Sequence, residues 1–145
     1  MNKEEFLIFR MFGILYGARL SRVREIITYA GRITPLPYNP VWVLGVINLR
    51  GEVTPVIDFR RKFSDIEPIY DAESIIIALR VKGDRVMAIM VDSVETIAEF
   101  DPDLLQKASD IGSGLDPAFL EGLAQIKDEM VSIIDVDTML DVNKI

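Results

Sequence analysis

The feature that most constrains the fold is a pair of short apolar runs separated by a turn within residues 44–60. The runs, Val46–Leu49 and Val53–Ile57, are rich in β-branched residues, which favour strands. Gly51 lies between them and can take the positive φ that a tight reversal needs. The pattern predicts a β-hairpin whose turn carries one basic side chain, Arg50, with no nucleophile beside it. Such a cation suits docking to a partner better than covalent chemistry.

Composition indicates one folded domain. Of the 145 residues, 50% are hydrophobic and 27% are charged, and a chain of this length buries roughly 70% of its unfolded surface. Apolar runs such as Ile75–Leu79 and Val86–Val91 are far shorter than the roughly 18–20 residues of a membrane helix. The first residues, Met1–Glu5, contain no apolar signal core. We therefore expect a cytoplasmic protein without direct membrane insertion.

Missing residue types exclude several classes of function. The chain contains no cysteine and no histidine, which excludes Cys/His zinc sites, thiol nucleophiles, Ser-His-Asp triads and phosphohistidine relays within it. The net charge of −7 makes nucleic-acid binding unexpected, although Arg60, Arg61 and Lys62 form a small basic cluster. No metal and no cofactor is expected.

Short strand-like segments separated by turn residues run through the whole chain. The expected strands cover residues 6–12, 14–20, 46–49, 53–57, 74–81, 85–91, 94–100, 119–126 and 130–136. Ser21 is expected to cap a short helix through Ile27, because Val23, Ile26 and Ile27 have helical spacing. The predicted class is mainly β, with around five strands in each half of the chain, enough for two small barrels.

The acidic segment 65–73, which contains Pro68, is the expected connector between two subdomains. The first would span about residues 14–65 and the second about residues 74–136, with the terminal segments packing across both. A last helix is expected at about residues 137–143. The whole chain, residues 1–145, would then form a single domain.

Four aspartates, Asp58, Asp92, Asp135 and Asp137, each follow an apolar strand, as phosphoacceptor and metal-binding carboxylates often do. A receiver domain, however, needs a parallel sheet with crossover helices of about ten residues or more, and the chain has no such helix between these strands. Strand-end caps or turn anchors are the favoured roles. A small carboxylate-dependent enzyme stays an alternative, which would require a pair of carboxylates with raised pKa values in a closed pocket.

Residues 40–60 resemble the signature of the CheW-like family, the coupling adaptors of bacterial chemotaxis. That signature is a proline, a short turn, Gly-Val-Ile-Asn-Leu-Arg-Gly, and an arm similar to Pro-Val-Ile-Asp-Leu-Arg, in which this chain has Phe59 for the usual leucine. Further similarity is found at Phe6–Phe9, Tyr16–Gly17, Val23–Ile26, Ile89–Val94 and Ile133–Val136. Ala18 and Arg19 depart from the apolar-acidic pair common in relatives. The resemblance covers nearly the whole chain.

The resemblance implies two five-stranded, SH3-like β-barrel subdomains with a shared core and short helices. It also implies a non-catalytic scaffold that couples the cytoplasmic tips of methyl-accepting chemoreceptors to the regulatory domain of the chemotaxis histidine kinase. The chain would be a monomer when free and would join membrane-associated receptor arrays. A similar pathway with another output, such as surface motility, is the alternative. A coupling domain detached from a kinase is less favoured, because the chain contains no ATP-binding or receiver sequence.

In relatives a receptor helix lies in the groove between the barrels. The positions that match this groove are Val23, Glu25, Ile26, Gly45, Arg50, Val94 and Ile97. Asp110 and Ile111 match positions near a kinase contact. The resemblance therefore supplies a receptor-binding set and a kinase-binding pair.

Each type of side chain in the receptor-binding set suits a helical partner. Val23, Val94 and Ile97 could anchor it, while charges such as Arg50 at the rim could set its register. Gly45 is expected to let the partner's backbone approach, so that a side chain there would block the partner while leaving the fold largely intact. Ordinary core packing is the alternative for the two valines.

Overall fold

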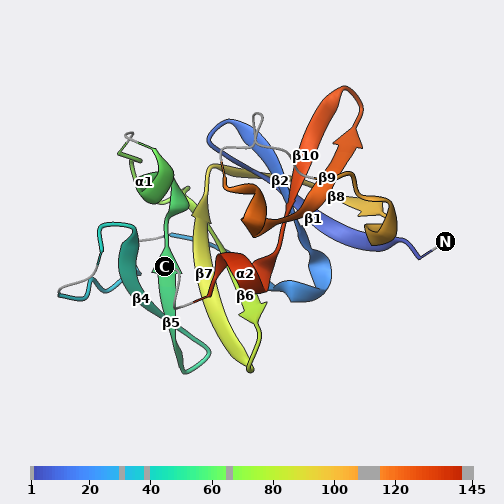
Figure 1. Cartoon of the computed structure of the whole chain (residues 1–145). Coiled ribbons are helices and arrows are strands. Elements are labelled where there is room, and N and C mark those ends of the chain that lie inside the picture. The colour runs from blue at the N-terminus through green and yellow to red at the C-terminus, as the bar shows by residue number, and fades with distance from the viewer. Residues whose placement is uncertain (1, 30–31, 38–39, 65–66, 108–114, 142–145) are drawn as a thin grey trace.

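The computed structural model describes residues 2–29, 32–37, 40–64, 67–107 and 115–141. These residues form two five-stranded β-sheets with short helices between strands (Figure 1). This architecture confirms the predicted mainly β class with two five-stranded units. No helix in the described ranges is long and apolar enough to cross a membrane.

One sheet contains strands from both ends of the chain and is called the terminal sheet; the other is called the central sheet. The terminal sheet has the order β8-β1-β2-β10-β9, with β1 Glu4–Met11, β2 Ile14–Arg19, β8 Ser93–Phe100, β9 Leu120–Ile126 and β10 Glu129–Ile134. The central sheet has the order β3-β6-β7-β5-β4, with β3 Val23–Thr28, β4 Val43–Leu49, β5 Glu52–Ile57, β6 Ile75–Val81 and β7 Arg85–Val91.

Aspartates cap the two α-helices found among the described residues. Asp58 accepts a hydrogen bond from the backbone N–H of Arg60 at the start of α1, Phe59–Phe63. Asp135 accepts one from the N–H of Thr138 at the start of α2, Val136–Met139. The described 3-10 turns are η1 Leu20–Arg22, η2 Pro102–Leu104 and η3 Pro117–Phe119. Asp58 and Asp135, expected as strand-end caps or turn anchors, thus cap the helices that directly follow β5 and β10.

The two sheets share one pairing pattern. From β8 to β9, and likewise from β3 to β4, neighbouring strands pair antiparallel, antiparallel, parallel and antiparallel. A capped helix follows one strand of each parallel pair: α1 follows β5, and α2 follows β10. The segment β3-β4-β5-α1 therefore corresponds to β8-β9-β10-α2. The central sheet continues into β6 and β7, whereas the terminal sheet takes their counterparts, β1 and β2, from the start of the chain.

Three apolar clusters hold the fold together. The largest is shared by both sheets and includes Leu7 and Phe9 of β1 together with Ile77 and Leu79 of β6. Residues that alternate with these belong to a second cluster within the central sheet, such as Ile76, or to a third within the terminal sheet. Because successive side chains of a strand point to opposite faces, β1 and β6 bury both faces. The shared core implied by the family resemblance is therefore present.

The predicted helix from Ser21 to Ile27 is wrong, because residues 23–28 form strand β3. β3 contains a bulge, since Val23 pairs with Leu79 whereas Glu25 pairs with the adjacent Ala78. One extra residue in a strand shifts the alternation of side chains, so that residues three apart share a face. Apolar residues three positions apart, such as Val23 and Ile26, are also typical of one face of a helix.

The strand pairing also divides the chain differently from the predicted subdomains of about residues 14–65 and 74–136. β6 and β7 join β3–β5 in the central sheet, while β2 lies beside β10 in the terminal sheet. The last helix begins at Val136 rather than 137, and residues 142–145 lie outside the described ranges. Strand order depends on pairing between distant segments, which local turn signals do not encode.

Candidate docking surface

The predicted anchors lie on two corresponding edge strands. Each of these strands is hydrogen-bonded to another strand of its sheet on one side only: β3 to β6, and β8 to β1. Both contain a bulge at the same place, because Val94 pairs with Phe9 whereas Thr96 pairs with the adjacent Ile8. Residues 23–26 of β3 therefore correspond to residues 94–97 of β8. Neither this correspondence nor the bulges are visible as a repeat in the sequence.

The bulges place two apolar side chains of each strand on the face toward the other sheet. Ile26 pairs with Ile77 and Ile97 with Leu7, and both partners belong to the shared cluster. Since directly paired residues share a face, Ile26 and Ile97 point to the same side as that cluster. They nevertheless remain 44% and 51% exposed. Each therefore leaves an exposed apolar side chain at an edge of the shared core.

Val23 and Val94 are partly buried and pack directly against the shared cluster. Part of each valine side chain therefore packs against the core, as the alternative interpretation predicted. Val23 lies on the same face of β3 as Ile26, and Val94 lies on the same face of β8 as Ile97. The four side chains therefore lie on the inter-sheet faces of their strands. We call Val23, Ile26, Val94 and Ile97 the rim.

Arg50 and Glu25 meet at one end of the central sheet. The Arg50 Nε lies 3.4 Å from Glu25 Oε1, and the arginine side chain is 73% exposed. Arg50 has φ 55° and Gly51 has φ 84°, as the predicted hairpin turn requires. The adjacent pair Arg24–Glu52, 2.6 Å apart, also joins β3 to this hairpin. An exposed pair at this distance holds the arginine weakly, which leaves it available to a partner.

Gly45 serves the fold, which corrects the expectation that a side chain there would leave the fold largely intact. It is buried, and a Cβ there would lie 2.1 Å from the backbone oxygen of Thr34 and 2.8 Å from the Pro35 Cα. Its φ of 143° is one that side-chain-bearing residues rarely adopt. The backbone that approaches Gly45 thus belongs to the chain's own segment at Thr34, which bridges to Val46. A substitution at Gly45 would disturb the fold itself.

The terminal sheet carries the counterpart of this arrangement. A Cβ at Gly122, φ 158°, would lie 2.7 Å from the backbone oxygen of Gln106, which bridges to Leu123. Lys127, φ 52°, occupies the turn position that corresponds to Arg50. Sequence reasoning missed Lys127, because the matching hairpins share their geometry rather than their residues. The kinase-binding pair, Asp110 and Ile111, lies outside the described residues.

The electrostatics give no support to acid–base catalysis. Asp58 is fully buried, and it accepts hydrogen bonds from Arg60 Nε and Nη2 at 2.9 and 2.8 Å and from the Tyr70 hydroxyl at 2.6 Å. Hydrogen bonds from Arg10 lower the pKa of Glu129, and those from Arg22 lower that of Asp137. A general acid needs a raised pKa. Among the described residues, no cluster of three or more acidic side chains could hold a metal ion.

The sequence pattern of the CheW-like domain matches residues 5–144. This chain belongs to the CheW-like family. Chemotaxis protein CheW of Klebsiella aerogenes is 32% identical over 137 residues, covering 94% of this chain and 81% of that protein. CheW of Rhizobium meliloti is 32% identical over 136 residues, covering 94% and 86%.

Solved structures agree with this membership. The crystal structure of scaffolding protein TtCheW from Thermoanaerobacter tengcongensis matches with a TM-score of 0.84 and 29% identity, covering 99% of this chain and 91% of that one. Protein FrzA of Myxococcus xanthus is also similar, at 34% identity over 92 residues, or 63% of this chain and 56% of that protein. The CheW-like family inferred from residues 40–60 is confirmed.

Proposed function

We propose that this chain is a chemotaxis scaffold that couples the cytoplasmic tips of chemoreceptors to the regulatory domain of the histidine kinase. Membership of the CheW-like family, a family of non-catalytic adaptors, is the observation that carries this function. The chain itself would catalyse no reaction. It would be monomeric when free and cytoplasmic, and would be recruited to receptor arrays. A different pathway output, such as surface motility, stays the alternative.

Receptor binding would use the rim together with the Arg50–Glu25 pair. An amphipathic helix binds by laying apolar side chains at i, i+3 and i+4 into an apolar groove. The exposed Ile26 and Ile97 offer such contacts, and Val23 and Val94 would form their floor. Arg50 would bind a carboxylate or a backbone carbonyl of the receptor through its planar guanidinium. Gly45 would contribute only by shaping strand β4.

Kinase binding would use a separate surface, for which Asp110 and Ile111 remain the proposed residues. Separate surfaces are required because a coupling protein must hold both partners at once. Variants of the rim should therefore affect receptor binding without affecting kinase binding.

Arg50→Ala tests the proposal, with Lys127→Ala as the matched control. Both residues occupy corresponding hairpin turns with nearly equal φ, 55° and 52°. Removing a hot-spot arginine costs about 2 kcal/mol, or roughly 30-fold in affinity. We expect calorimetric titration with a receptor tip to show this loss for Arg50→Ala and near-parental affinity for Lys127→Ala.

Kinase-domain binding is the second readout, and it should be unchanged in both variants. Equal receptor affinity of Arg50→Ala and the parent would remove Arg50 from the site. Capture of neither a receptor tip nor a kinase regulatory domain by the parent protein would refute the proposed function as a whole.

A further inference from the structure

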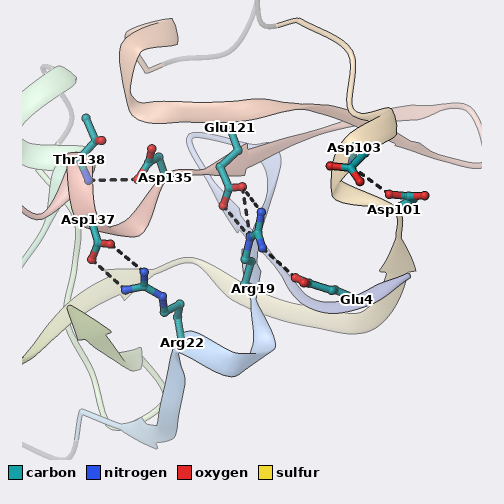
Figure 2. Close-up of polar contacts among 9 residues, drawn as sticks. All are labelled: Glu4, Arg19, Arg22, Asp101, Asp103, Glu121, Asp135, Asp137 and Thr138. Carbon is teal, nitrogen blue, oxygen red and sulfur yellow. Dashed lines mark hydrogen bonds and ion pairs between the residues drawn. The ribbon is translucent and has the colours of Figure 1, made fainter. Parts of the chain in front are cut away.

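Arg22 and Asp137 form an ion pair where the chain first crosses between the sheets. Arg22 ends η1, immediately before β3, and Asp137 lies in α2. Figure 2 shows the two parallel contacts, Nη1 to Oδ1 at 2.8 Å and Nη2 to Oδ2 at 2.7 Å. Asp137 Oδ1 also accepts the backbone N–H of Lys82 at 2.8 Å, and Arg22 donates to the carbonyl of Arg80 at 3.0 Å. The pair thus ties the helix that follows the terminal sheet to the β6–β7 hairpin of the central sheet.

Arg60 and Asp92 form a second ion pair where the chain crosses back. Asp92 immediately precedes β8, and Arg60 lies in α1. Their contact, Nη1 to Oδ1, is 2.6 Å long. Arg60 is also fixed by Asp58, and the backbone N–H of Asp92 donates to the carbonyl of Arg10 in β1 at 2.8 Å. This pair ties α1, the helix that follows β5 of the central sheet, to the terminal sheet.

The two pairs occupy similar places with their charges exchanged. Arg60 and Asp137 each follow the capping aspartate by two residues, because Asp58 corresponds to Asp135. Arg22 stands directly before β3 and Asp92 directly before β8, one residue earlier than Ser93, which matches Arg22 in the strand register. The cation lies on the helix in one pair and on the crossing segment in the other. Two ion pairs of opposite polarity at similar places indicate that the link itself matters rather than one residue type.

We propose that these two ion pairs are latches that fix the orientation of the central sheet relative to the terminal sheet. The shared apolar cluster holds the sheets together, but hydrophobic attraction is non-directional. Charge-assisted and bidentate hydrogen bonds have a fixed geometry. A latch at each crossing therefore restrains rotation of one sheet against the other.

Orientation matters because the rim is divided between the sheets, and this consequence rests on the proposed function. Ile26 lies on β3 of the central sheet and Ile97 on β8 of the terminal sheet. A rigid receptor helix would meet both only when the sheets hold one orientation. Apparent affinity falls in proportion to the fraction of protein in the competent state. Loss of the latches should therefore weaken receptor binding.

Residual dipolar couplings of backbone amides test the latches directly. The variants are Arg22→Gln, Asp92→Asn and the two combined. Arg19→Gln is the matched control, because Arg19 binds Glu121 and Glu4 with similar geometry and exposure but entirely within the terminal sheet (Figure 2). In the parent and the control, one alignment tensor should fit both sheets. In the double variant, the two sheets should require different degrees of order, with smaller differences in the single variants.

A rescue variant separates the link from local packing. Arg22→Asp should disturb the alignment, and adding Asp137→Arg, which copies the polarity of the second pair, should restore a common tensor. One tensor for both sheets in the double variant, or in each single variant if the double variant does not fold, would overturn the proposal. An equal disturbance in Arg19→Gln would do the same.

Binding of a receptor tip gives the functional readout. We expect about three- to tenfold weaker affinity for the double variant and no change for Arg19→Gln. If the parent binds no receptor tip, the proposed function fails, while the dipolar couplings still decide whether the latches exist.

Discussion

Gly45→Ala should destabilise the fold severely, although it adds a single methyl group. A positive φ of 143° strains any side-chain-bearing residue, at a cost of about 1–3 kcal/mol. The new Cβ would also stand 2.1 Å from the Thr34 oxygen, which is backbone and cannot rotate away. Forcing such a contact costs about 1–3 kcal/mol more. We expect a total loss of roughly 2–6 kcal/mol in the free energy of unfolding.

Urea unfolding followed by circular dichroism measures this loss. With a slope of about 2 kcal/mol per molar, the midpoint should fall by roughly 1–3 M. Gly51→Ala is the control, because Gly51 also has a positive φ, 84°, but a Cβ there would meet no atom within 4 Å. It should lose only about 1 kcal/mol from strain. Equal midpoints for the two variants would refute the argument that Gly45 serves the fold.

Three further variants and conditions probe the core and the ion pairs. Ile77→Asp puts a charge into the shared cluster, where Ile77 is fully buried. This variant should lose at least about 4 kcal/mol of its free energy of unfolding, so circular dichroism should report a largely unfolded chain. Asp58→Ala leaves the mostly buried guanidinium of Arg60 without its main partner and should lose about 3–5 kcal/mol in urea unfolding. Acid should weaken the Arg22–Asp137 pair, because Arg22 lowers the pKa of Asp137 below 3.8 in the folded chain. The stabilisation from this pair is therefore full above pH 3.8 and is lost as the pH falls through the pKa of Asp137 in the folded state. The urea midpoints of the parent and Arg22→Gln should therefore converge only as the pH falls below 3.8, and a constant difference would contradict the assignment.

Local chemistry made several elements predictable from sequence. The hairpin of β4 and β5 follows from β-branched arms and from a glycine at the turn, where φ is indeed positive. The capping role of Asp58 follows from a carboxylate that stands directly after an apolar strand. The apolar run Val86–Val91 favours a buried strand, and its Met87 and Met90 are both buried.

Features that depend on pairing between distant segments could not be predicted from the sequence. The grouping of β1 and β2 with β10 depends on contacts between opposite ends of the chain. The Arg22–Asp137 pair joins residues 115 positions apart, and no local sequence pattern predicts such a pair. The bulge in β3 spaced apolar residues as a helix would, so Val23 and Ile26 were assigned to the wrong element but placed correctly on one face.

Gly45 shows that a close backbone approach can have a source within the chain itself. Its sequence context indicated a close backbone approach, and that approach exists. The approaching segment, however, is Thr34 of the same chain rather than a partner. Sequence alone does not distinguish these cases, because both need a residue without a side chain.

Chemical-shift mapping of the isotope-labelled chain is the most direct test of its proposed role as a two-surface scaffold. The chain would be titrated separately with a chemoreceptor tip and with the kinase regulatory domain. We predict that the receptor tip shifts the amides around Ile26, Arg50 and Ile97, while the kinase domain shifts a different set. No perturbation by either partner, or the same perturbed residues with both, would contradict a scaffold that joins the two.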